Sequence, residues 1–296
     1  MDNTYLKGIE RSKLWWMIDV APAIEQRVPD LYPYIAAGLV GDGSDCFGFD
    51  DEISLDHDAD TRVKLWIPMG VGGEGAEYRI RSAVGLSTKG VLSVEEIPQF
   101  YRRYTGLDFS PNTWHEWLAI PQKNLAAATN GEVFFDEPGR FSERRRVLLD
   151  YYPQDVCLKL LEGAVLRMGQ AGQYNYPRCL RRNERVAAQL AKSIFIDAAL
   201  NALFILNKRY MPFYKWAHRA LTSLPILGEY ASDLLDRIAC TENATGEIEE
   251  LSQAIINELH AQQLSSDDSD FLIPHARVLR EQIIEPELRE ANPWKI

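Results

Sequence analysis

The stretch GLVGDGSDCFGFDDEISLDHD, residues 38–58, joins a glycine-rich turn to a dense group of acids. Gly43-Ser44 is followed, after eleven residues, by Asp56 and Asp58. On an extended strand, two aspartates at this spacing point to the same face. Carboxylate oxygens bind Mg²⁺ together with substrate phosphates, and a Gly-Ser turn can bring backbone N–H groups and a hydroxyl against a phosphate. The pattern predicts a metal-dependent site for attack on a nucleotide phosphate.

The same acids also have a plainer interpretation. Asp56 and Asp58 could form a solvated acidic turn, but the preceding Gly-Ser turn and the following strand favour two metal ligands. The acids at residues 50–52 are expected in solvent or capping a turn. His57 lies between the two aspartates, so it points to the opposite face and is expected to pack or to support the ligands indirectly, not to bind the metal.

The residues after this stretch predict further strands. TRVKLWIPM, residues 61–69, alternates polar and apolar residues and predicts a strand. GVGGEG, residues 70–75, predicts a hairpin-type loop, and because it does not open a helix it gives little support for dinucleotide binding. EYRIRSAVGL, residues 77–86, predicts another strand, and residues 94–105 predict a short helix.

The character of the chain changes near residue 137. The second half is dominated by helical patterns, and ERVAAQLAKSIFIDAALNALFILN, residues 184–207, predicts the central helix of a bundle. We therefore expect the α+β class, with a mixed sheet and helices in residues 1–137 and an all-α bundle in residues 138–296. DEPG, residues 136–139, is the expected turn between the halves.

Composition excludes several classes of function. The 296 residues carry a formal net charge of −11, which disfavours long nucleic acid as a partner. No apolar run reaches the roughly 18 residues of a membrane span, and the N-terminus does not look like a secretory signal. We expect a cytoplasmic protein that does not enter a membrane. Its four cysteines form no CxxC pair, so zinc and disulfides are not expected.

Two groups of basic and aromatic residues in the helical half are candidate contacts for a nucleotide. Asn175 and Arg178 lie before the long helix, and Lys208, Arg209 and Lys215 follow it. Charge groups are usually solvated, but interleaved aromatic and basic side chains suit a base and its phosphates. The helix between the groups is about 30 Å long by its rise per residue, so they need not meet.

At this point the sequence resembles a known superfamily. The order hydrophobic-Gly-x-Gly-Ser, about a dozen residues, then Asp-x-Asp and a hydrophobic strand resembles the polymerase-beta-like nucleotidyltransferases, which include aminoglycoside-modifying and small antitoxin-type members. Residues 38–58 are more similar still to an uncharacterised bacterial family, DUF4037. The segments TNGEVFFDEPGRF, YYPQDV, GQYNYPRCLRRNE and LNKRYMPFYKW also resemble it, so the resemblance covers about residues 35–225.

This resemblance implies an activity. It implies transfer of a nucleoside monophosphate from an NTP to a hydroxyl, with release of pyrophosphate and two Mg²⁺ ions held by Asp56 and Asp58. The acceptor stays open: a small molecule, a protein side chain or an RNA end. The resemblance also implies a helical domain like that of kanamycin nucleotidyltransferase, and it allows a homodimer.

Related enzymes often use a third carboxylate on a neighbouring strand. Glu77 is the preferred candidate because it begins a predicted strand. Glu95, Glu96 and Glu116 are less attractive because they occur in helix-like or loop-like contexts. Since no third acid is obvious, a catalytically degenerate nucleotide-binding or regulatory module is the alternative function. An antitoxin-type partner ranks lower because such chains are usually much shorter.

Overall fold

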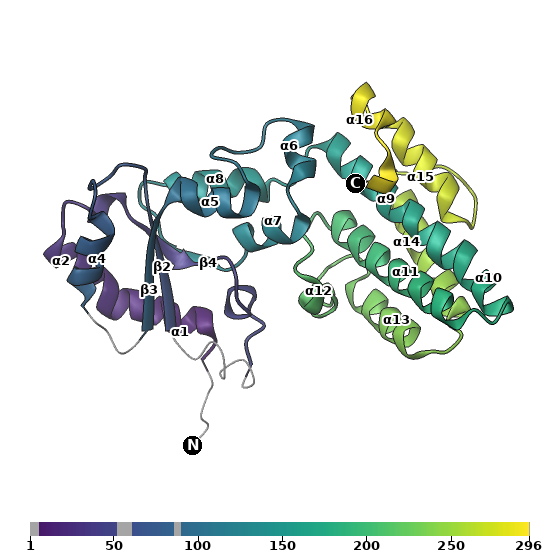
Figure 1. The fold of residues 1–296 in the computed structure, drawn as a ribbon, viewed down its shortest axis with the longest axis horizontal. Coiled ribbons are helices and arrows are strands. Elements are labelled where there is room, and N and C mark those ends of the chain that lie inside the picture. The colour runs from purple at the N-terminus through teal and green to yellow at the C-terminus, as the bar shows by residue number, and fades with distance from the viewer. Residues whose placement is uncertain (1–5, 52–60, 86–89, 296) are drawn as a thin grey trace, which may run out of the picture. The chain divides into compact units, whose positions relative to one another are not determined.

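The chain forms two compact units in a computed structural model that describes residues 6–51, 61–85 and 90–295 (Figure 1). Unit 1 comprises Met1–Pro111 and Ile120–Asp150, and unit 2 comprises Asn112–Ala119 and Tyr151–Ile296. We expected the change of domain near residue 137. Helix α8 (Arg140–Leu149) belongs to unit 1, however, so the chain leaves this unit for the last time after Asp150.

Unit 1 is built around a four-stranded mixed sheet with the strand order β3-β2-β1-β4. Its strands are β1 (Ala36–Leu39), β2 (Thr61–Ile67), β3 (Gly90–Glu96) and β4 (Glu132–Phe135). Strand β1 runs antiparallel to β2 and β4, whereas β2 and β3 are parallel. The mixed sheet expected for the first half is confirmed, including the strand over the alternating residues 61–67.

Helices cover both faces of this sheet, because β2 carries large apolar side chains on each. On one face, buried residues of β2 such as Val63 and Leu65 join the core formed with the N-terminal helices. On the other face, Trp66 stacks on Phe141 of α8 at a ring-centroid distance of 4.0 Å and meets Phe100 edge-on. The helical elements of unit 1 are α1 (Gly8–Trp15), η1 (Trp16–Val20), α2 (Ala21–Arg27), η2 (Tyr32–Tyr34), η3 (Asp45–Phe47), α4 (Ala76–Val84), α5 (Ile97–Thr105), α7 (Gln122–Thr129) and α8.

The prediction of a strand over residues 77–86 is wrong. Helix α4 occupies Ala76–Val84 and buries Ala76, Ile80 and Ala83, which follow a helical spacing. This helix also connects β2 to β3, and parallel neighbours need such a crossover connection. Polar and apolar residues alternate over a short stretch of this segment. The segment nevertheless forms a helix, because it connects two parallel strands.

Unit 2 is helical, as expected for the second half of the chain. Its elements are α6 (Trp114–Ala119), α9 (Gln154–Met168), η4 (Gly169–Asn175), α10 (Tyr176–Arg181), α11 (Arg185–Leu206), α12 (Tyr214–Leu221), α13 (Gly228–Cys240), α14 (Thr245–Ala261), α15 (Leu272–Glu281), α16 (Pro286–Glu290) and η5 (Pro293–Lys295). Helix α11 packs against α9, α10 and η4. It is therefore the central helix that the apolar segment predicts.

Helix α11 is also the one described helix that is long and apolar enough to cross a bilayer by length and composition. Within unit 2, 61% of its most apolar window is buried. Phe195, Leu203 and Phe204 belong to that buried surface. Core helices of bundles are apolar where they pack, so packing within unit 2 accounts for the apolar residues on the buried face of α11.

Candidate functional site

The turn after β1 depends on two glycines with positive φ. Gly41 has φ 116° and Gly43 has φ 123°, a region that side-chain-bearing residues rarely adopt. A Cβ on Gly41 would lie 2.5 Å from the Tyr104 hydroxyl and 2.8 Å from Lys64 Nζ. A Cβ on Gly43 would collide with Arg62 and Asp45. The glycines therefore let side chains from β2 and α5 come close to the turn.

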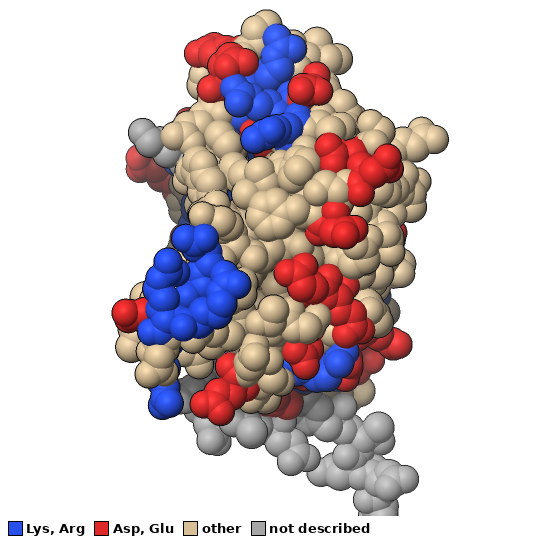
Figure 2. All heavy atoms as spheres, turned by 90° about the vertical axis from the view of Figure 1, so that its right-hand side faces the viewer, with Lys and Arg blue, Asp and Glu red and all other residues tan. Residues whose placement is uncertain are grey.

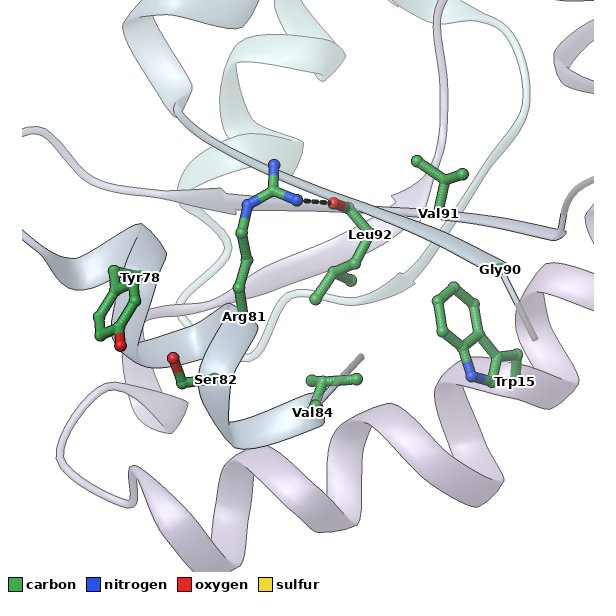
Figure 3. Close-up of a pocket in the computed structure, with 9 residues that line it drawn as sticks. Trp15, Tyr78, Arg81, Ser82, Val84, Gly90, Val91 and Leu92 are labelled. Carbon is green, nitrogen blue, oxygen red and sulfur yellow. Dashed lines mark hydrogen bonds between the residues drawn. The ribbon is translucent and has the colours of Figure 1, made fainter. Parts of the chain in front are cut away.

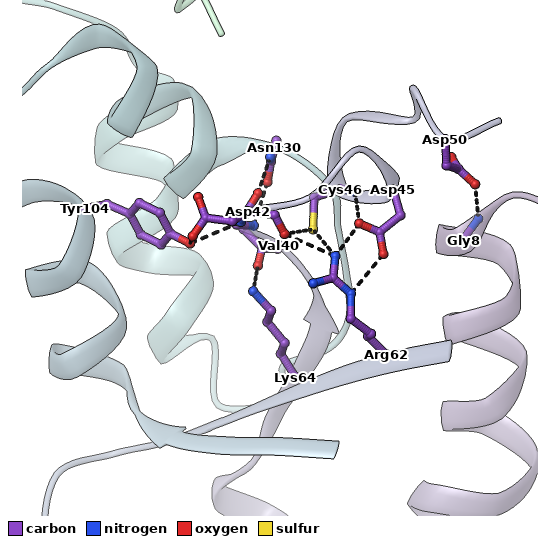
Figure 4. Close-up of polar contacts among 11 residues, drawn as sticks. Gly8, Val40, Asp42, Asp45, Cys46, Asp50, Arg62, Lys64, Tyr104 and Asn130 are labelled. Atoms are coloured by element: carbon purple, nitrogen blue, oxygen red, sulfur yellow. Dashed lines mark hydrogen bonds and ion pairs between the residues drawn. The ribbon is translucent and has the colours of Figure 1, made fainter. Parts of the chain in front are cut away.

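Arg62 contacts the turn most directly, as Figure 4 shows. Its guanidinium forms an ion pair with Asp45 and donates from Nε to Asp45 Oδ2 at 3.1 Å. Its Nη2 also donates to the carbonyl oxygen of Asp42 at 3.1 Å. Because Asp45 is buried, this pair is poorly screened by solvent. Arg62 thus places a planar cation directly beneath Gly43.

Lys64 lies two residues further along β2 and therefore on the same face of the sheet. Its Nζ donates to the carbonyl oxygen of Val40 at 2.8 Å. Burial lowers the pKa of Lys64, and the positive charge of Arg62 acts in the same direction. Arg62 and Lys64 thus bring two cationic groups to the turn between β1 and Ser44, where Asp42 and Asp45 supply two carboxylates. Cationic groups of this kind can bind a phosphate.

Two polar side chains hold the turn from the other side (Figure 4). The Tyr104 hydroxyl donates to Asp42 Oδ2 at 2.9 Å and accepts from the Asp42 backbone N–H at 3.2 Å. Asn130, which follows α7, accepts from Gly41 N at 2.8 Å and donates to Gly41 O at 2.7 Å. Burial, together with the charge of Asp42, raises the pKa of Tyr104, so its proton stays in place at neutral pH.

Ser44 and the acids that follow it are anchored within unit 1. Ser44 is buried, and its carbonyl oxygen accepts from Phe49 N at 2.8 Å. Asp50, which we expected in solvent or capping a turn, is buried and accepts from Gly8 N at 2.8 Å, at the start of α1. Lys7 Nζ also donates to Gly48 O at 2.9 Å. The end of the turn is thus fixed against α1.

Glu95 provides a carboxylate on the strand next to β2. In the parallel register Lys64 pairs with Ser93 and Trp66 with Glu95, so Glu95 lies on the same sheet face as Lys64. Its side chain is largely buried and forms an ion pair with Arg103 of α5. The prediction of a helix-like context for Glu95 is wrong, because β3 extends to Glu96 before α5 begins.

Glu77, the carboxylate preferred from the sequence, lies elsewhere. It occupies the first turn of α4, where its exposed side chain accepts from Arg81 Nε at 2.8 Å. It is not on a strand. The strand context that favoured Glu77 as the third carboxylate is therefore absent, whereas Glu95 lies on the strand next to β2.

Asp56 and Asp58, the predicted metal ligands, lie outside the described residues. In the sequence they come just before β2, which carries Arg62 and Lys64. Within the described ranges, no group of three His, Cys, Asp or Glu side chains is arranged to hold a metal ion. A metal site at the turn therefore depends on these two aspartates.

The residues of unit 2 that were predicted to contact a nucleotide lie in two separate places. The guanidinium of Arg178 lies 4.6 Å from the ring centroid of Tyr174, near Asn175 at the end of η4. Beyond the other end of α11, Lys215 Nζ lies 4.3 Å from the ring of Trp216. Helix α11, with 22 residues and a length of about 33 Å, lies between the two places in the chain.

The remaining predicted contacts, Lys208 and Arg209, follow the C-terminal end of α11. Lys208 has φ 50°, and the Arg209 carbonyl oxygen accepts from the Tyr151 hydroxyl at 3.3 Å. Figure 2 views the end of unit 2 where α10 lies and shows basic side chains in patches among acidic ones. One ligand inside unit 2 cannot contact both groups.

Two pockets lined by described residues contain no predicted site residue. The pocket of about 670 Å³ in unit 1 lies between α4 and β3, where Arg81 Nη1 donates to Leu92 O at 2.6 Å (Figure 3). Its lining is mostly apolar and includes Trp15 and Val84. The second pocket, of about 470 Å³, lies in unit 2 near the start of α11. The polar turn is distinguished by its chemistry.

Cys46 of this turn should be chemically inert. Burial raises the pKa of its thiol to about 12, and the negative charge of Asp45 contributes. Because the thiolate is the reactive form, iodoacetamide at neutral pH should leave Cys46 unmodified. Cys240 is exposed and should react readily. Peptide mass spectrometry of the labelled native protein checks this expectation, and early modification of Cys46 would contradict it.

The sequence did not identify several residues that surround the turn. The alternation in TRVKLWIPM contains a usable signal for Arg62 and Lys64, because it places both on one face of β2. Tyr104 and Asn130 carry no such signal. Their contacts with Asp42 and Gly41 span 62 and 89 residues, and only the tertiary fold brings them together.

Comparison with known families gives one match. Residues 117–217 match the sequence model of a family described as a domain of unknown function, DUF4037. The match includes β4 and α8 of unit 1 and extends through α11 of unit 2. No curated protein and no solved structure matches the chain. The chain therefore carries a DUF4037 domain at residues 117–217.

Proposed function

We propose that this protein is a Mg²⁺-dependent nucleotidyltransferase that moves a nucleoside monophosphate from an NTP to a hydroxyl acceptor. The observation that supports this most is the arrangement around Gly43. Arg62 and Lys64 of β2 reach the glycine turn, and Glu95 lies on the same face of the neighbouring parallel strand. In the sequence, Asp56 and Asp58 stand between the turn and β2.

The turn and the two cations would bind the triphosphate. Gly43 allows close approach of the backbone, and the guanidinium of Arg62 can make two parallel hydrogen bonds to phosphate oxygens. Lys64 would add a second positive charge in a partly buried place, where electrostatic attraction is stronger than in water. A bound phosphate would then compete with Asp45 for Arg62.

Three carboxylates would hold the metal ions. Asp56, Asp58 and Glu95 offer the hard oxygen donors that Mg²⁺ prefers. Glu95 keeps acceptor capacity beside its pair with Arg103, because an ionised carboxylate has about four lone-pair sites. When bound, the ions would supply charge stabilisation to the attacking and leaving oxygens.

The proposed reaction is a substitution at phosphorus. The oxygen of the acceptor hydroxyl forms a bond to the α-phosphorus, and the bond from this phosphorus to the oxygen bridging to the β-phosphate breaks. Pyrophosphate leaves with that oxygen. The hydroxyl proton passes to a carboxylate, and we assign this role to Glu95, which shares a sheet face with Lys64.

A matched pair of variants tests the role of Glu95. With mixtures of NTPs and hydroxyl compounds, Glu95→Gln should lower pyrophosphate release by about a hundredfold or more, the usual range for a general base. Glu77→Gln removes the same charge from the exposed surface of α4 and should match wild type. The opposite pattern would return the role to Glu77. Unchanged release in both variants would remove Glu95 from the mechanism.

A second candidate function is a nucleotide-binding module without turnover. The observation in its favour is that Arg62 already donates hydrogen bonds to the Asp45 carboxylate and to the Asp42 carbonyl oxygen. These protein groups compete with a triphosphate for the Arg62 guanidinium. This function predicts NTP binding without pyrophosphate release in every acceptor mixture. Binding calorimetry combined with the release assay separates the two functions.

A further inference from the structure

Helix α11 exposes an apolar stripe on the side opposite its buried face. Val186, Leu190 and Ile194 are spaced four residues apart and lie on one helix face. Their exposed fractions are 77%, 62% and 50%. Such exposure is unusual for three neighbouring large apolar side chains on a core helix, and contiguous exposed apolar surface commonly marks an interaction site.

The stripe is also free of charge along its length. The other exposed residues between Val186 and Ile194 are Ala187, Gln189 and Ser193, all of them neutral, and Lys192 is buried. One quarter of the whole chain is charged, so a neutral exposed face of more than two turns is a marked departure. Depletion of charge is typical of the centre of a protein interface.

The pattern of the stripe is symmetric about Leu190. Val186 and Ile194, both β-branched, stand four residues before and after it. The small residues Ala187 and Ser193 stand three residues before and after it. An antiparallel copy of the same helix would therefore set apolar against apolar and small against small, which allows close packing of the two helices.

We propose that this stripe, residues 186–194 of α11, is a self-association surface that binds a second copy of the chain in antiparallel orientation. Leu190 then lies on the two-fold axis, and Val186 contacts Ile194 of the partner subunit. Such an interface is isologous, because the same patch serves both copies. The proposal is independent of the nucleotidyltransferase activity.

The size of the stripe sets the expected strength. A contact between two single helices is smaller than the roughly 1,200–2,000 Å² buried by stable interfaces. The dimer should therefore dissociate on dilution. Sedimentation velocity of the full chain over a wide concentration range should show a monomer converting to a dimer as concentration rises.

Leu190→Glu tests the surface against a matched control. It places two carboxylates against each other on the axis, so the dissociation constant should rise by at least about tenfold. Ile284→Glu makes the same change at another position of unit 2, where the side chain is 82% exposed, and should dimerise like wild type. A wild-type chain that stays monomeric, or a dimer unaffected by Leu190→Glu, would overturn the proposal.

A cysteine at the axis tests the antiparallel geometry. In a Cys240→Ser background, which removes the exposed native thiol, Leu190→Cys should form an inter-chain disulfide on mild oxidation, because the two Cα atoms meet at the crossing point. Ile284→Cys should not cross-link. Equal cross-linking of both variants would mean random collision, and its absence in both would exclude Leu190 from the axis.

Discussion

Replacing Asp56 and Asp58 together with asparagine should abolish NTP-dependent pyrophosphate release. Asparagine keeps the size of each side chain but removes the charge that would hold Mg²⁺. Changes to residues that only support metal ligands already cost about 10–100-fold in metal affinity or activity. Loss of both ligands should therefore exceed about a hundredfold. Retained turnover in the double variant would exclude the proposed reaction.

Calorimetry extends this test to the binding step. Wild type should bind at least one of ATP, GTP, CTP and UTP more tightly with Mg²⁺ than without it, and the double variant should lose that difference. His57→Gln serves as the neighbouring control, since the Asp-x-Asp spacing predicts that the His57 side chain points away from the two carboxylates. Equal loss of binding in the control would indicate a general disturbance of the segment.

Gly43→Ala should have the largest effect on stability among changes in the turn. A residue with a side chain is strained at φ 123°, and the added Cβ would also collide with Arg62 and Asp45. Backbone strain of this kind costs about 1–3 kcal/mol, and displacing one partner of a buried ion pair costs more. We expect unit 1 to lose about 3 kcal/mol or more of unfolding free energy.

Gly48→Ala separates the cost of backbone strain from the cost of the collision with Arg62 and Asp45. Gly48 has φ 69°, so alanine is strained there too, but a Cβ at this position meets no atom within 4 Å. We expect Gly48→Ala to lower the free energy of unfolding by only about 1–2 kcal/mol, which is the cost of placing alanine in the left-handed region of the backbone. Hydrogen exchange of β1 and β2 peptides in increasing urea reports on unit 1 by itself. Equal destabilisation by both variants would show that the contacts of Arg62 and Asp45 contribute little.

The positions of Glu77 and Glu95 show how topology corrects a local pattern. Residues 77–86 alternate in the sequence, which favoured a strand at Glu77. The parallel pairing of β2 and β3 requires a crossover, and α4 supplies it. The same topology moves Glu95 from an expected helix onto β3. Sequence periodicity alone does not contain this information, because strand direction is a property of the sheet.

Local sequence patterns were enough to predict the broad fold and the nature of the turn. These patterns predicted a mixed sheet followed by helices, the strand over residues 61–67 and the central helix α11, because these depend on periodicity within one segment. They also placed Gly43 at a turn, and the positive φ there confirms this. Local rules were sufficient in each of these cases.

The side chains that surround that turn are brought there by the three-dimensional fold. Tyr104 and Asn130 hold Asp42 and Gly41 across 62 and 89 residues, and Glu95 joins the face of Lys64 through strand register. The fold also keeps the two basic groups of unit 2 at opposite ends of α11. The physical reason is that these relations arise from long-range packing and pairing, which bring together residues that carry no common local signal.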